Sequence, residues 1–525
     1  MSLLHHNLFR SADSLPENEA YRCFDNSISY KELDEKSNQL ARVLTVHDCK
    51  PRDRVCIFLN KSIQSAIAVY GILKAGAVFV PIDPDAPEDR ISAIIEDTES
   101  NLIVSDDSNR TDLESVVASS PRHITVLGCS EPECAPPDRY VSWNQVFDAD
   151  CSRFECSDIE SSDLAYIIFT SGSSGVPKGI MHTHASGQAY AEMTVKTYGI
   201  TSVDRISNHA PLHFDISTLG YLSAPLVGAT TVFIPEVYTR IPASMSALAE
   251  KEQLTIWYSV PFALIQMLNR GALEQRDLRS LRWVLYGGEP FSPRQIRRLM
   301  DYWPQARFSN VYGPAETNQC SYFHIPETLD GQEDDIPIGE FTSHASGIIL
   351  NDSGVQAQSD EIGELLVHSQ AMMKGYWRRP ELNQACFCDH GEPGVTYYRT
   401  GDLARRSRGG LLYYHGRKDR LIKIRGNRIE LDEVEAAFSA HSLIAESAAY
   451  VVDAGSESEH IEVCVLSITD GDIPPADLLD FAKNRLPRYA IPESLLLLDE
   501  FPRTTSGKVD RKALQKRRNE VGATH

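Results

Sequence analysis

The sequence predicts an α/β protein in which parallel sheets are covered by helices, followed by a smaller C-terminal domain. Short β-rich runs alternate with segments of helical apolar periodicity through most of the chain, which is the pattern of parallel sheets. With 525 residues the chain is too long for one hydrophobic core, so two or more domains are expected. The character of the sequence changes near Asp419, where the smaller domain is predicted to begin.

The predicted elements of the N-terminal part follow from apolar spacing. Apolar residues recur with a helical period after Tyr30, and a second helix, over residues 63–76, is predicted to end at Gly76. The predicted strands are short apolar runs between such helices. They cover residues 54–59, 77–83, 101–106, 229–236, 254–260 and 281–290.

The C-terminal part has a different pattern. Turn-rich, basic, hairpin-like strands lead into a predicted helix over residues 431–444, and a short strand–helix–strand set follows. We therefore predict two domains, residues 1–418 and residues 419–525.

The charge and hydropathy of the chain exclude several function classes. The formal net charge of −22 argues against broad contact with nucleic acid or anionic lipid, because phosphate groups would be repelled. No apolar run is long enough to span a bilayer, and the first twenty residues do not have the pattern of a secretion signal. We expect a soluble, cytoplasmic protein that binds neither nucleic acid nor membrane.

The eleven cysteines are expected to be reduced thiols. Cys129, Cys134, Cys151 and Cys156 form two pairs, an arrangement that zinc uses with tighter spacing. The surrounding residues have the composition of a surface loop. A loop is therefore favoured over zinc, and the same holds for the short "CFCDH" segment that begins at Cys386.

The stretch "YIIFTSGSSGVPKGI", residues 166–180, carries the clearest chemical signal. An apolar strand runs into hydroxyls and glycines, whose N–H and O–H groups can surround phosphate oxygens, and Lys178 adds a positive charge. A flexible Ser/Gly linker is the alternative reading. The ordinary P-loop is a poor match, because Pro177 precedes the lysine and Gly179 follows it.

This stretch closely resembles the phosphate loop of the acyl- and aminoacyl-adenylating superfamily. Nearly the whole chain is similar, in order, to adenylation domains of nonribosomal peptide synthetases. The matching motifs include "ISYKEL", "LKAGAVFVPIDP", "HFDIS", "NVYGPAET", "YRTGDL", "GRKDRLIKIRGNRIELDEVE", "LPRYAIP" and "SGKVDR". The resemblance implies stacked α/β subdomains, a small β-barrel-like subdomain and a mobile α+β C-terminal domain.

The resemblance also implies a reaction with ATP and Mg²⁺. Such enzymes join a carboxylate to the α-phosphate of ATP, release pyrophosphate and pass the acyl group to a thiol. In this sequence Glu316 would hold the magnesium ion, and the other nucleotide-binding positions surround phosphate, ribose and adenine. They are Thr170, Ser171, Gly172, Ser173, Ser174, Gly175, Lys178, Gly287, Gly288, Glu289, Asn310, Tyr312, Asp402 and Arg417.

The C-terminal domain of the family rotates between two poses, and the resemblance assigns residues to each. Lys508 would bridge the substrate carboxylate and the α-phosphate, and Asp419 would be the hinge. After rotation Gly426 would line the approach of the thiol, and Lys423 would serve the second half-reaction. The chain departs from the family pattern at Ala315 and Ser506, where threonine and asparagine are usual.

The resemblance places the substrate's ammonium group at Asp215, because a buried carboxylate needs a cationic partner. The implied pocket is mostly apolar, which argues against charged side chains. It consists of Phe214, Asp215, Ile216, Leu219, Tyr258, Leu285, Gly287, Val311, Gln319 and Cys320, closed by Lys508. The pattern is similar to that of stand-alone prolyl ligases, except that Gln319 stands where those enzymes have an apolar residue.

We therefore expect an amino acid–carrier protein ligase with L-proline as substrate, acting on a separate carrier protein with a phosphopantetheine arm. No stretch resembles a carrier or condensation domain, and the basic "RKALQKRR" segment could meet an acidic carrier. The alternatives are a ligase for D-alanine or another small neutral amino acid, an acyl-CoA ligase, and a catalytically silent homologue.

Overall fold

The structure is a computed structural model of the chain, with two compact units. It describes residues 2–132, 139–170, 177–327, 335–390, 394–418, 420–456, 458–467, 474–498, 500–503, 509–511 and 513–515. The first unit consists of Met1–Pro84, Ile95–Phe169 and Gly179–Lys418. The second consists of Asp85–Ile94, Thr170–Lys178 and Asp419–His525. Asp419 lies outside the described residues, and the domain boundary predicted there remains a prediction.

A nine-stranded mixed sheet in the described part of the first unit carries most of the predicted site residues. Its strand order is β16-β15-β14-β13-β12-β10-β11-β1-β2, and the strands from β1 through β14 in this order run parallel. The strands are β1 (Glu19–Cys23), β2 (Asn26–Ser29), β10 (Arg205–Asn208), β11 (Thr230–Phe233), β12 (Ile256–Ser259), β13 (Trp283–Gly287), β14 (Arg307–Tyr312), β15 (Ser321–His324) and β16 (Glu340–Phe341).

A second sheet, of eight strands within the described residues, has the order β19-β9-β8-β4-β3-β5-β6-β7. Its strands are β3 (Arg54–Ile57), β4 (Val78–Pro81), β5 (Leu102–Val104), β6 (Thr125–Gly128), β7 (Tyr140–Ser142), β8 (Leu164–Thr170), β9 (Lys178–Thr183) and β19 (Gly375–Tyr376). The predicted strands at residues 54–59, 77–83 and 101–106 are confirmed as β3, β4 and β5.

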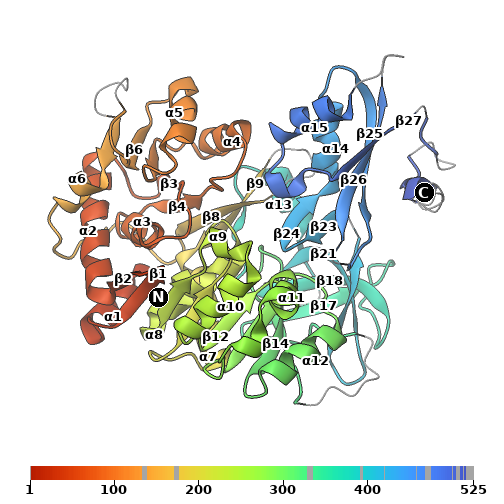
Figure 1. Cartoon of the computed structure of the whole chain (residues 1–525), viewed down its shortest axis with the longest axis horizontal. Coiled ribbons are helices and arrows are strands. Elements are labelled where there is room, and N and C mark those ends of the chain that lie inside the picture. Colours follow the sequence, from red (N-terminus) through yellow and green to blue (C-terminus); the bar gives the residue numbers. More distant parts are fainter. Residues whose placement is uncertain are drawn as a thin grey trace. The chain divides into compact units, whose positions relative to one another are not determined.

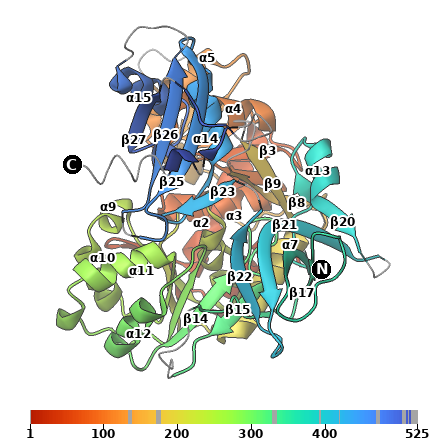
Figure 2. The same cartoon turned by 90° about the vertical axis from the view of Figure 1, so that its right-hand side faces the viewer.

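The third sheet of the first unit is antiparallel and corresponds to the expected barrel-like subdomain. Figure 2 shows β17, β21 and β22 in this region, and β21 pairs with β18, β20 and β22. Its strands are β17 (Ala345–Leu350), β18 (Ile362–Ser369), β20 (Phe387–Asp389), β21 (Thr396–Arg406) and β22 (Leu412–Arg417).

The helices cover the sheets as the alternating pattern predicts. Figure 1 shows α3 beside β3 and β4, with α2 packed against α3. The α-helices are α1 (His5–Ser14), α2 (Tyr30–Val46), α3 (Ile63–Lys74), α4 (Glu88–Thr98), α5 (Arg110–Ser119), α6 (Trp143–Phe147), α7 (His184–Tyr198), α8 (Ala224–Val227), α9 (Glu236–Thr239), α10 (Pro242–Lys251), α11 (Pro261–Arg270), α12 (Pro293–Tyr302), α13 (Pro380–Cys386), α14 (Leu431–Ser439) and α15 (Pro475–Lys483). Shorter helical turns are η1 (Asp215–Ser217), η2 (Leu219–Ser223), η3 (Leu273–Gln275) and η4 (Arg488–Ala490).

Local sequence explains where the predicted helices begin and end. Ser29 and Glu32 form a reciprocal capping box that begins α2, since each side chain bonds the other's backbone N–H. Gly76 follows α3 at φ +76°, a left-handed conformation that glycine adopts without strain. Helix α3 contacts both β1 of the nine-stranded sheet and β4 of the eight-stranded sheet, so its apolar side chains fill the core between them.

The second unit contains the predicted C-terminal elements. A hairpin is formed by β23 (Leu421–Ile424) and β24 (Asn427–Glu430), and a further sheet by β25 (Ile444–Val452), β26 (His460–Ser467) and β27 (Ser494–Leu498). Helix α14 packs on β25 (Figure 2), and their apolar residues share one core with α15. The α/β fold class and the small α+β C-terminal part are thereby confirmed. Among the described residues, no helix combines the length and the apolar character needed to cross a membrane.

Candidate active site

Two predicted nucleotide-binding residues converge on the carboxylate of a third, Asp402 of β21. The hydroxyl of Tyr312 donates to Oδ2 of Asp402 at 2.5 Å, and Nη1 of Arg417 lies 2.6 Å from Oδ1. Burial, and then the charge of Asp402, raise the pKa of Tyr312 well above its ordinary value. Because Asp402 is only 5% exposed, these bonds fix the orientation of a carboxylate that can still accept bonds from ribose hydroxyls.

The other residues predicted to meet adenine lie at the ends of neighbouring parallel strands. Gly287 ends β13, and a Cβ there would lie 2.3 Å from the carbonyl oxygen of Val311, so only glycine permits this approach. Gly288 follows with φ +97°, and Glu289 is half-buried. The amide nitrogen of Asn310 donates to the carbonyl of Pro337 at 2.8 Å, which orients the side chain.

Glu316, the predicted magnesium ligand, is fully buried at 0% exposure. The hydroxyl of Tyr376 donates to its Oε1 at 2.7 Å. Nε2 of His182 contacts the carbonyl oxygen of Ala315 at 3.0 Å, and burial lowers the pKa of His182 to about 4, so a neutral imidazole donates this bond. A buried carboxylate held by a neutral hydroxyl is a hard oxygen donor, which fits Mg²⁺.

Several predicted residues fall outside the described part of the chain. They are Ser171, Gly172, Ser173, Ser174 and Gly175 of the phosphate loop, the hinge Asp419, and Lys508. The residues that flank the loop are described: Thr170 ends β8 and Lys178 begins β9. Oγ1 of Thr170 is buried with no hydrogen-bond partner among the described residues, and Nζ of Lys178 lies 3.2 Å from Oε1 of Glu430, within the second unit.

The register of the nine-stranded sheet places four predicted pocket residues on one face. Tyr258 pairs with Leu285, and Gly287 pairs with Val311. Since alternate residues of a strand point to the same side, Leu285 and Gly287 share a face, and all four residues lie on it. Tyr258, Leu285 and Val311 join Leu219 and the half-buried Ile216 in one apolar cluster.

Asp215 lies in the same neighbourhood as this cluster. It begins the turn η1, and its Oδ1 accepts the N–H of Ile216 at 3.0 Å. Burial raises the pKa values of Tyr190 and Tyr258, and the negative charge of Asp215 adds to both shifts. A carboxylate close to two buried phenols and an apolar wall is a suitable partner for a small ammonium group.

The remaining predicted pocket residues, Gln319, Phe214 and Cys320, lie in different surroundings. Gln319 is 6% exposed, and its Nε2 donates to the hydroxyl of Tyr198 at 2.6 Å. Phe214 is half-buried beside His213. Cys320 is fully buried but packs in a different apolar cluster, with Ile338 and its neighbours. Sequence alone did not reveal this separation.

In the second unit, Lys423 lies on β23 and is half-buried. The turn to β24 has positive φ at both Arg425 and Gly426, the backbone of a tight two-residue hairpin. The turn therefore requires a residue with positive φ at position 426, which glycine adopts without strain.

Cysteines do not gather into a metal-type group among the described residues. Cys129 is buried, Cys151 exposed and Cys156 half-buried, while Cys134 lies outside the described part. The group of metal-ligand type that the described residues do contain is His5, His6 and Glu155. Leu3 N–H donates to Nδ1 of His6 at 3.3 Å, which leaves Nε2 of His6 to donate to Glu155, so hydrogen bonds account for this group.

Two residues that sequence reasoning missed touch the predicted site directly. Tyr376 bonds Glu316 from 60 residues away, and Tyr198 bonds Gln319 from 121 residues away. Tyr376 stands inside the run "GELLVHSQAMMKGYWRRPEL", residues 363–382, which also resembles a motif of the family and could have led to it. Tyr198 had no such signal, since it reads as the last apolar residue of a helix.

Asp402→Asn is expected to raise the KM for ATP about tenfold. The asparagine amide has one accepting oxygen where the carboxylate has two, so it cannot accept bonds from Arg417, Tyr312 and a ribose together. The measurement is the ATP dependence of pyrophosphate exchange. The control is Asp360→Asn, which changes an exposed carboxylate in the turn before β18 that pairs with Arg405. An unchanged KM for ATP would contradict a ribose-binding role for Asp402.

The predicted nucleotide-binding residues include strand ends of the parallel sheet, and an apolar cluster with one carboxylate nearby belongs to the same sheet region. An enzyme that joins a carboxylate to a nucleotide needs both kinds of site. Comparison with protein families agrees. Residues 8–377 match the model of the AMP-binding enzyme, and residues 433–508 match the model of the AMP-binding enzyme C-terminal domain. The chain belongs to the AMP-binding enzyme family. It is an AMP-forming ligase that uses ATP to adenylate a carboxylate.

Two relatives extend over nearly the whole chain. The L-proline–[L-prolyl-carrier protein] ligase of Pseudomonas fluorescens is 32% identical over 514 residues, covering 98% of this chain and 99% of the relative. Tyrocidine synthase 1 of Brevibacillus parabrevis is 31% identical over 513 residues, covering 97% of this chain but only 44% of the relative. The adenylation part is therefore shared with both, and the full length only with the first.

Solved structures have the same fold. The Vibrio cholerae adenylation domain AlmE, in complex with glycyl-adenosine-5'-phosphate, superimposes with a TM-score of 0.86 at 22% identity, over 98% of each chain. The crystal structure of IdnL1 gives a TM-score of 0.79 at 26% identity, over 95% of this chain and 99% of that one.

Proposed function

We propose that this protein is an amino acid–[carrier protein] ligase. It activates a small neutral amino acid and transfers it to the phosphopantetheine thiol of a separate carrier protein. The amino acid that we propose is L-proline. The observation that carries this proposal is Asp215, which lies close to two buried tyrosines and an apolar pocket wall. The full-length similarity to a prolyl-carrier ligase supports proline within that class.

In the first half-reaction, a substrate carboxylate attacks the α-phosphate of ATP and pyrophosphate leaves. Asp402, with Tyr312 and Arg417, holds the ribose so that the α-phosphate faces the carboxylate. Thr170, Lys178 and the loop between them bind the outer phosphates, and Lys508 neutralises charge between the carboxylate and the α-phosphate. Magnesium, held by Glu316, would neutralise phosphate charge when bound.

In the second half-reaction, the thiol of the carrier attacks the aminoacyl-adenylate and AMP leaves. We propose that residues 419–525 form the mobile domain, that Asp419 is its hinge, and that Lys423 and Gly426 act at the thiol. A hinge residue absorbs a large dihedral change at a domain boundary. The tight turn at Gly426 gives a thiol arm close access to the backbone.

An acyl-CoA ligase is the principal rival, since the first half-reaction is the same. The two are separated by offering coenzyme A and a pantetheinylated carrier protein to the loaded enzyme. Transfer to the carrier alone supports the proposal, and transfer to coenzyme A alone overturns it.

Amino-acid-dependent ATP–pyrophosphate exchange tests the substrate class. The panel contains L-proline, hydroxyproline, D- and L-alanine, glycine and threonine. Asp215→Asn, which keeps the shape and removes the charge, is expected to lower kcat/KM for the amino acid about 10²–10³-fold, because a buried ammonium group loses its partner. The KM for ATP should stay unchanged.

Asp25→Asn is the matched control, since Asp25 is 91% exposed and pairs only with Lys251 among the described residues. The proposal is supported if the wild-type protein catalyses exchange with one amino acid and Asp215→Asn loses most of that exchange activity. Exchange that survives this substitution would show that Asp215 does not bind the ammonium group, and silence across the panel would remove the amino-acid class itself.

A further inference from the structure

The amide of Gln319 is engaged by the protein itself. Its Nε2 donates to the hydroxyl of Tyr198 at 2.6 Å, and both residues are buried, at 6% and 2% exposure. Gln319 is the polar residue that distinguishes this pocket from the apolar pattern of prolyl ligases. The partner of its amide therefore decides whether the pocket presents a polar or an apolar end to a substrate.

Tyr198 is held firmly in position. It is the last residue of α7, and Gly199 follows in the left-handed conformation at φ +57°. The carbonyl oxygen of Tyr198 accepts bonds from Nη1 of Arg282 at 2.9 Å and from Nε1 of Trp283 at 3.0 Å. Its ring also packs edge-on against Trp283, with 5.5 Å between ring centroids. The hydroxyl is thus fixed by backbone and ring contacts independent of Gln319.

A second polar pair lies near the hydroxyl of Tyr198. Ser309 is close enough to affect the pKa of Tyr198, and Oγ of Ser309 lies 3.1 Å from Nδ1 of the half-buried His324. Burial, and then the nearby charge of Arg307, lower the pKa of His324, so its imidazole is neutral and can accept at Nδ1. The hydroxyl oxygen of Tyr198 accepts the bond from the Gln319 amide.

Tyr198 also packs with residues of the predicted substrate pocket. It shares an apolar cluster with Leu219, Tyr258, Leu285 and Val311. Its phenol group is close enough to Tyr258 to contribute to the raised pKa of that residue, as Asp215 does. The Tyr198–Gln319 bond therefore lies beside the residues predicted to hold the amino acid side chain.

We propose that Tyr198 is a positioning residue that binds the Gln319 amide and so makes a polar pocket position compatible with an apolar substrate side chain. This inference rests on the proposed function. It assigns a role to a residue outside the set that the family resemblance supplied. The class of substrate that follows is a small amino acid with an apolar side chain, such as proline.

The physical reason is the asymmetry of buried hydrogen bonds. Removing one partner leaves a buried donor unsatisfied, which costs much more than replacing both partners by apolar groups of similar shape. In Tyr198→Phe the Gln319 amide has lost its acceptor and can be satisfied only by water or by a polar substrate. A second change, Gln319→Leu, removes the unsatisfied amide.

The experiment measures kcat/KM in ATP–pyrophosphate exchange for proline and for hydroxyproline. Tyr198→Phe is expected to lower kcat/KM for proline about tenfold or more, and to shift the proline-to-hydroxyproline ratio toward hydroxyproline. The KM for ATP should not change. The double variant Tyr198→Phe/Gln319→Leu is expected to recover proline activation to within about threefold of the wild-type protein.

Tyr70→Phe is the matched control. The hydroxyl of Tyr70 donates to the carbonyl of Tyr221 at 2.7 Å, and the residue is 1% exposed, so the substitution also removes one buried hydrogen bond. We expect a similar loss of thermal stability and an unchanged substrate ratio. A substrate ratio that moves equally in both variants would reduce Tyr198 to a structural residue and overturn the proposal.

The other outcomes are also decisive. Among the described residues, none donates a hydrogen bond to the side-chain oxygen Oε1 of Gln319. If this oxygen bound the substrate, the wild-type protein would prefer hydroxyproline to proline. That preference, or a double variant that fails to recover while still folded, would overturn the proposal. Exchange with no amino acid at all would overturn the proposed function first, which distinguishes the two failures.

Discussion

Glu316→Gln is expected to lower kcat for amino-acid-dependent ATP–pyrophosphate exchange about 10²–10³-fold. The change keeps the shape of the side chain and removes its charge. Glu316 is fully buried and receives a bond from Tyr376, so the carboxylate is oriented but not neutralised by that hydroxyl. The measurement is the exchange rate over a range of magnesium concentrations, where a lost ligand appears as a much higher magnesium requirement.

Two further variants test the specificity of this effect. Tyr376→Phe removes the orienting hydroxyl, and a smaller loss of about three- to tenfold is expected. Glu252→Gln changes another buried glutamate, which pairs with Arg205, and its magnesium dependence should match the wild-type protein. If Glu316→Gln lowered only thermal stability, with exchange by the folded fraction intact, Glu316 would be a structural residue.

The α/β class and many individual elements could be predicted from local pattern. Apolar periodicity after Tyr30 and the capping pair at Ser29 define α2, and the strand before Thr170 is β8. Sheet membership could not be predicted in this way. Strands β1 and β11, some two hundred residues apart in sequence, pair in parallel, and β19 joins the sheet of β9. Such pairings depend on tertiary packing, which period and propensity do not encode.

In the candidate site, too, some features could be predicted from sequence and others could not. Asp402, Tyr312 and Arg417 could be identified by motif, and the structure brings their side chains together. Motifs carry no information about which partner satisfies a buried group. Tyr198 is a helix-terminal aromatic by pattern, and its bond to Gln319 exists because α7 and the segment before β15 meet in the folded chain.

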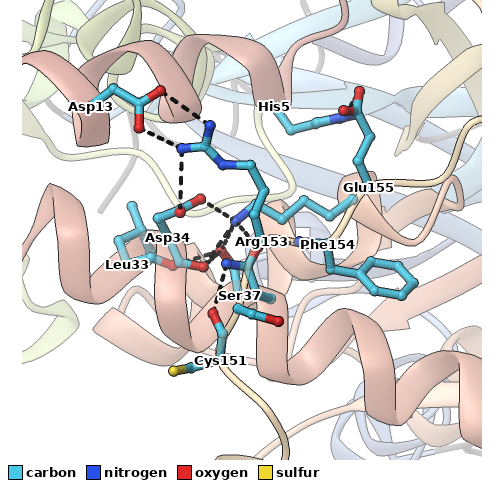
Figure 3. Close-up of polar contacts among 12 residues, drawn as sticks. His5, Asp13, Leu33, Asp34, Ser37, Cys151, Arg153, Phe154 and Glu155 are labelled. Carbon is cyan, nitrogen blue, oxygen red and sulfur yellow. Dashed lines mark hydrogen bonds and ion pairs between the residues drawn. The ribbon is translucent and has the colours of Figure 1, made fainter.

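Lys74 of α3 is the clearest buried group that local pattern misreads, since a lysine at a helix end is ordinarily exposed. Its side chain is 0% exposed, and Nζ contacts Oδ1 of Asp34 at 2.6 Å, Oγ of Ser37 at 2.8 Å and Oδ1 of Asn38 at 2.7 Å. Figure 3 shows Asp34 and Ser37 together, with Arg153 and Asp13 beside them. The ammonium group thus joins α3 to α2.

Asp34→Asn is expected to lower the free energy of unfolding by about 3–5 kcal/mol, because it leaves the buried Lys74 charge without its counter-ion. The double variant Lys74→Met/Asp34→Asn removes both charges and should recover most of this loss. Chemical denaturation measures both. A double variant that is less stable than Asp34→Asn would mean that the polar contacts of Lys74 outweigh the cost of burying its charge.

The same lysine gives an expected pH dependence whose sign is fixed. Burial lowers the pKa of Lys74 from 10.5 to about 8, despite the opposing effect of Asp34. Between these values the unfolded chain binds the proton that the folded chain has released, so this group makes the protein more stable as pH rises from 8 to 10.5. The full difference is about 3 kcal/mol at 1.36 kcal/mol per pKa unit. Lys74→Met should lack this gain, so the stability of the wild-type protein relative to the variant should rise across that window. A constant difference would mean that Lys74 keeps its proton in the folded protein, and that the Asp34 carboxylate fully compensates its burial.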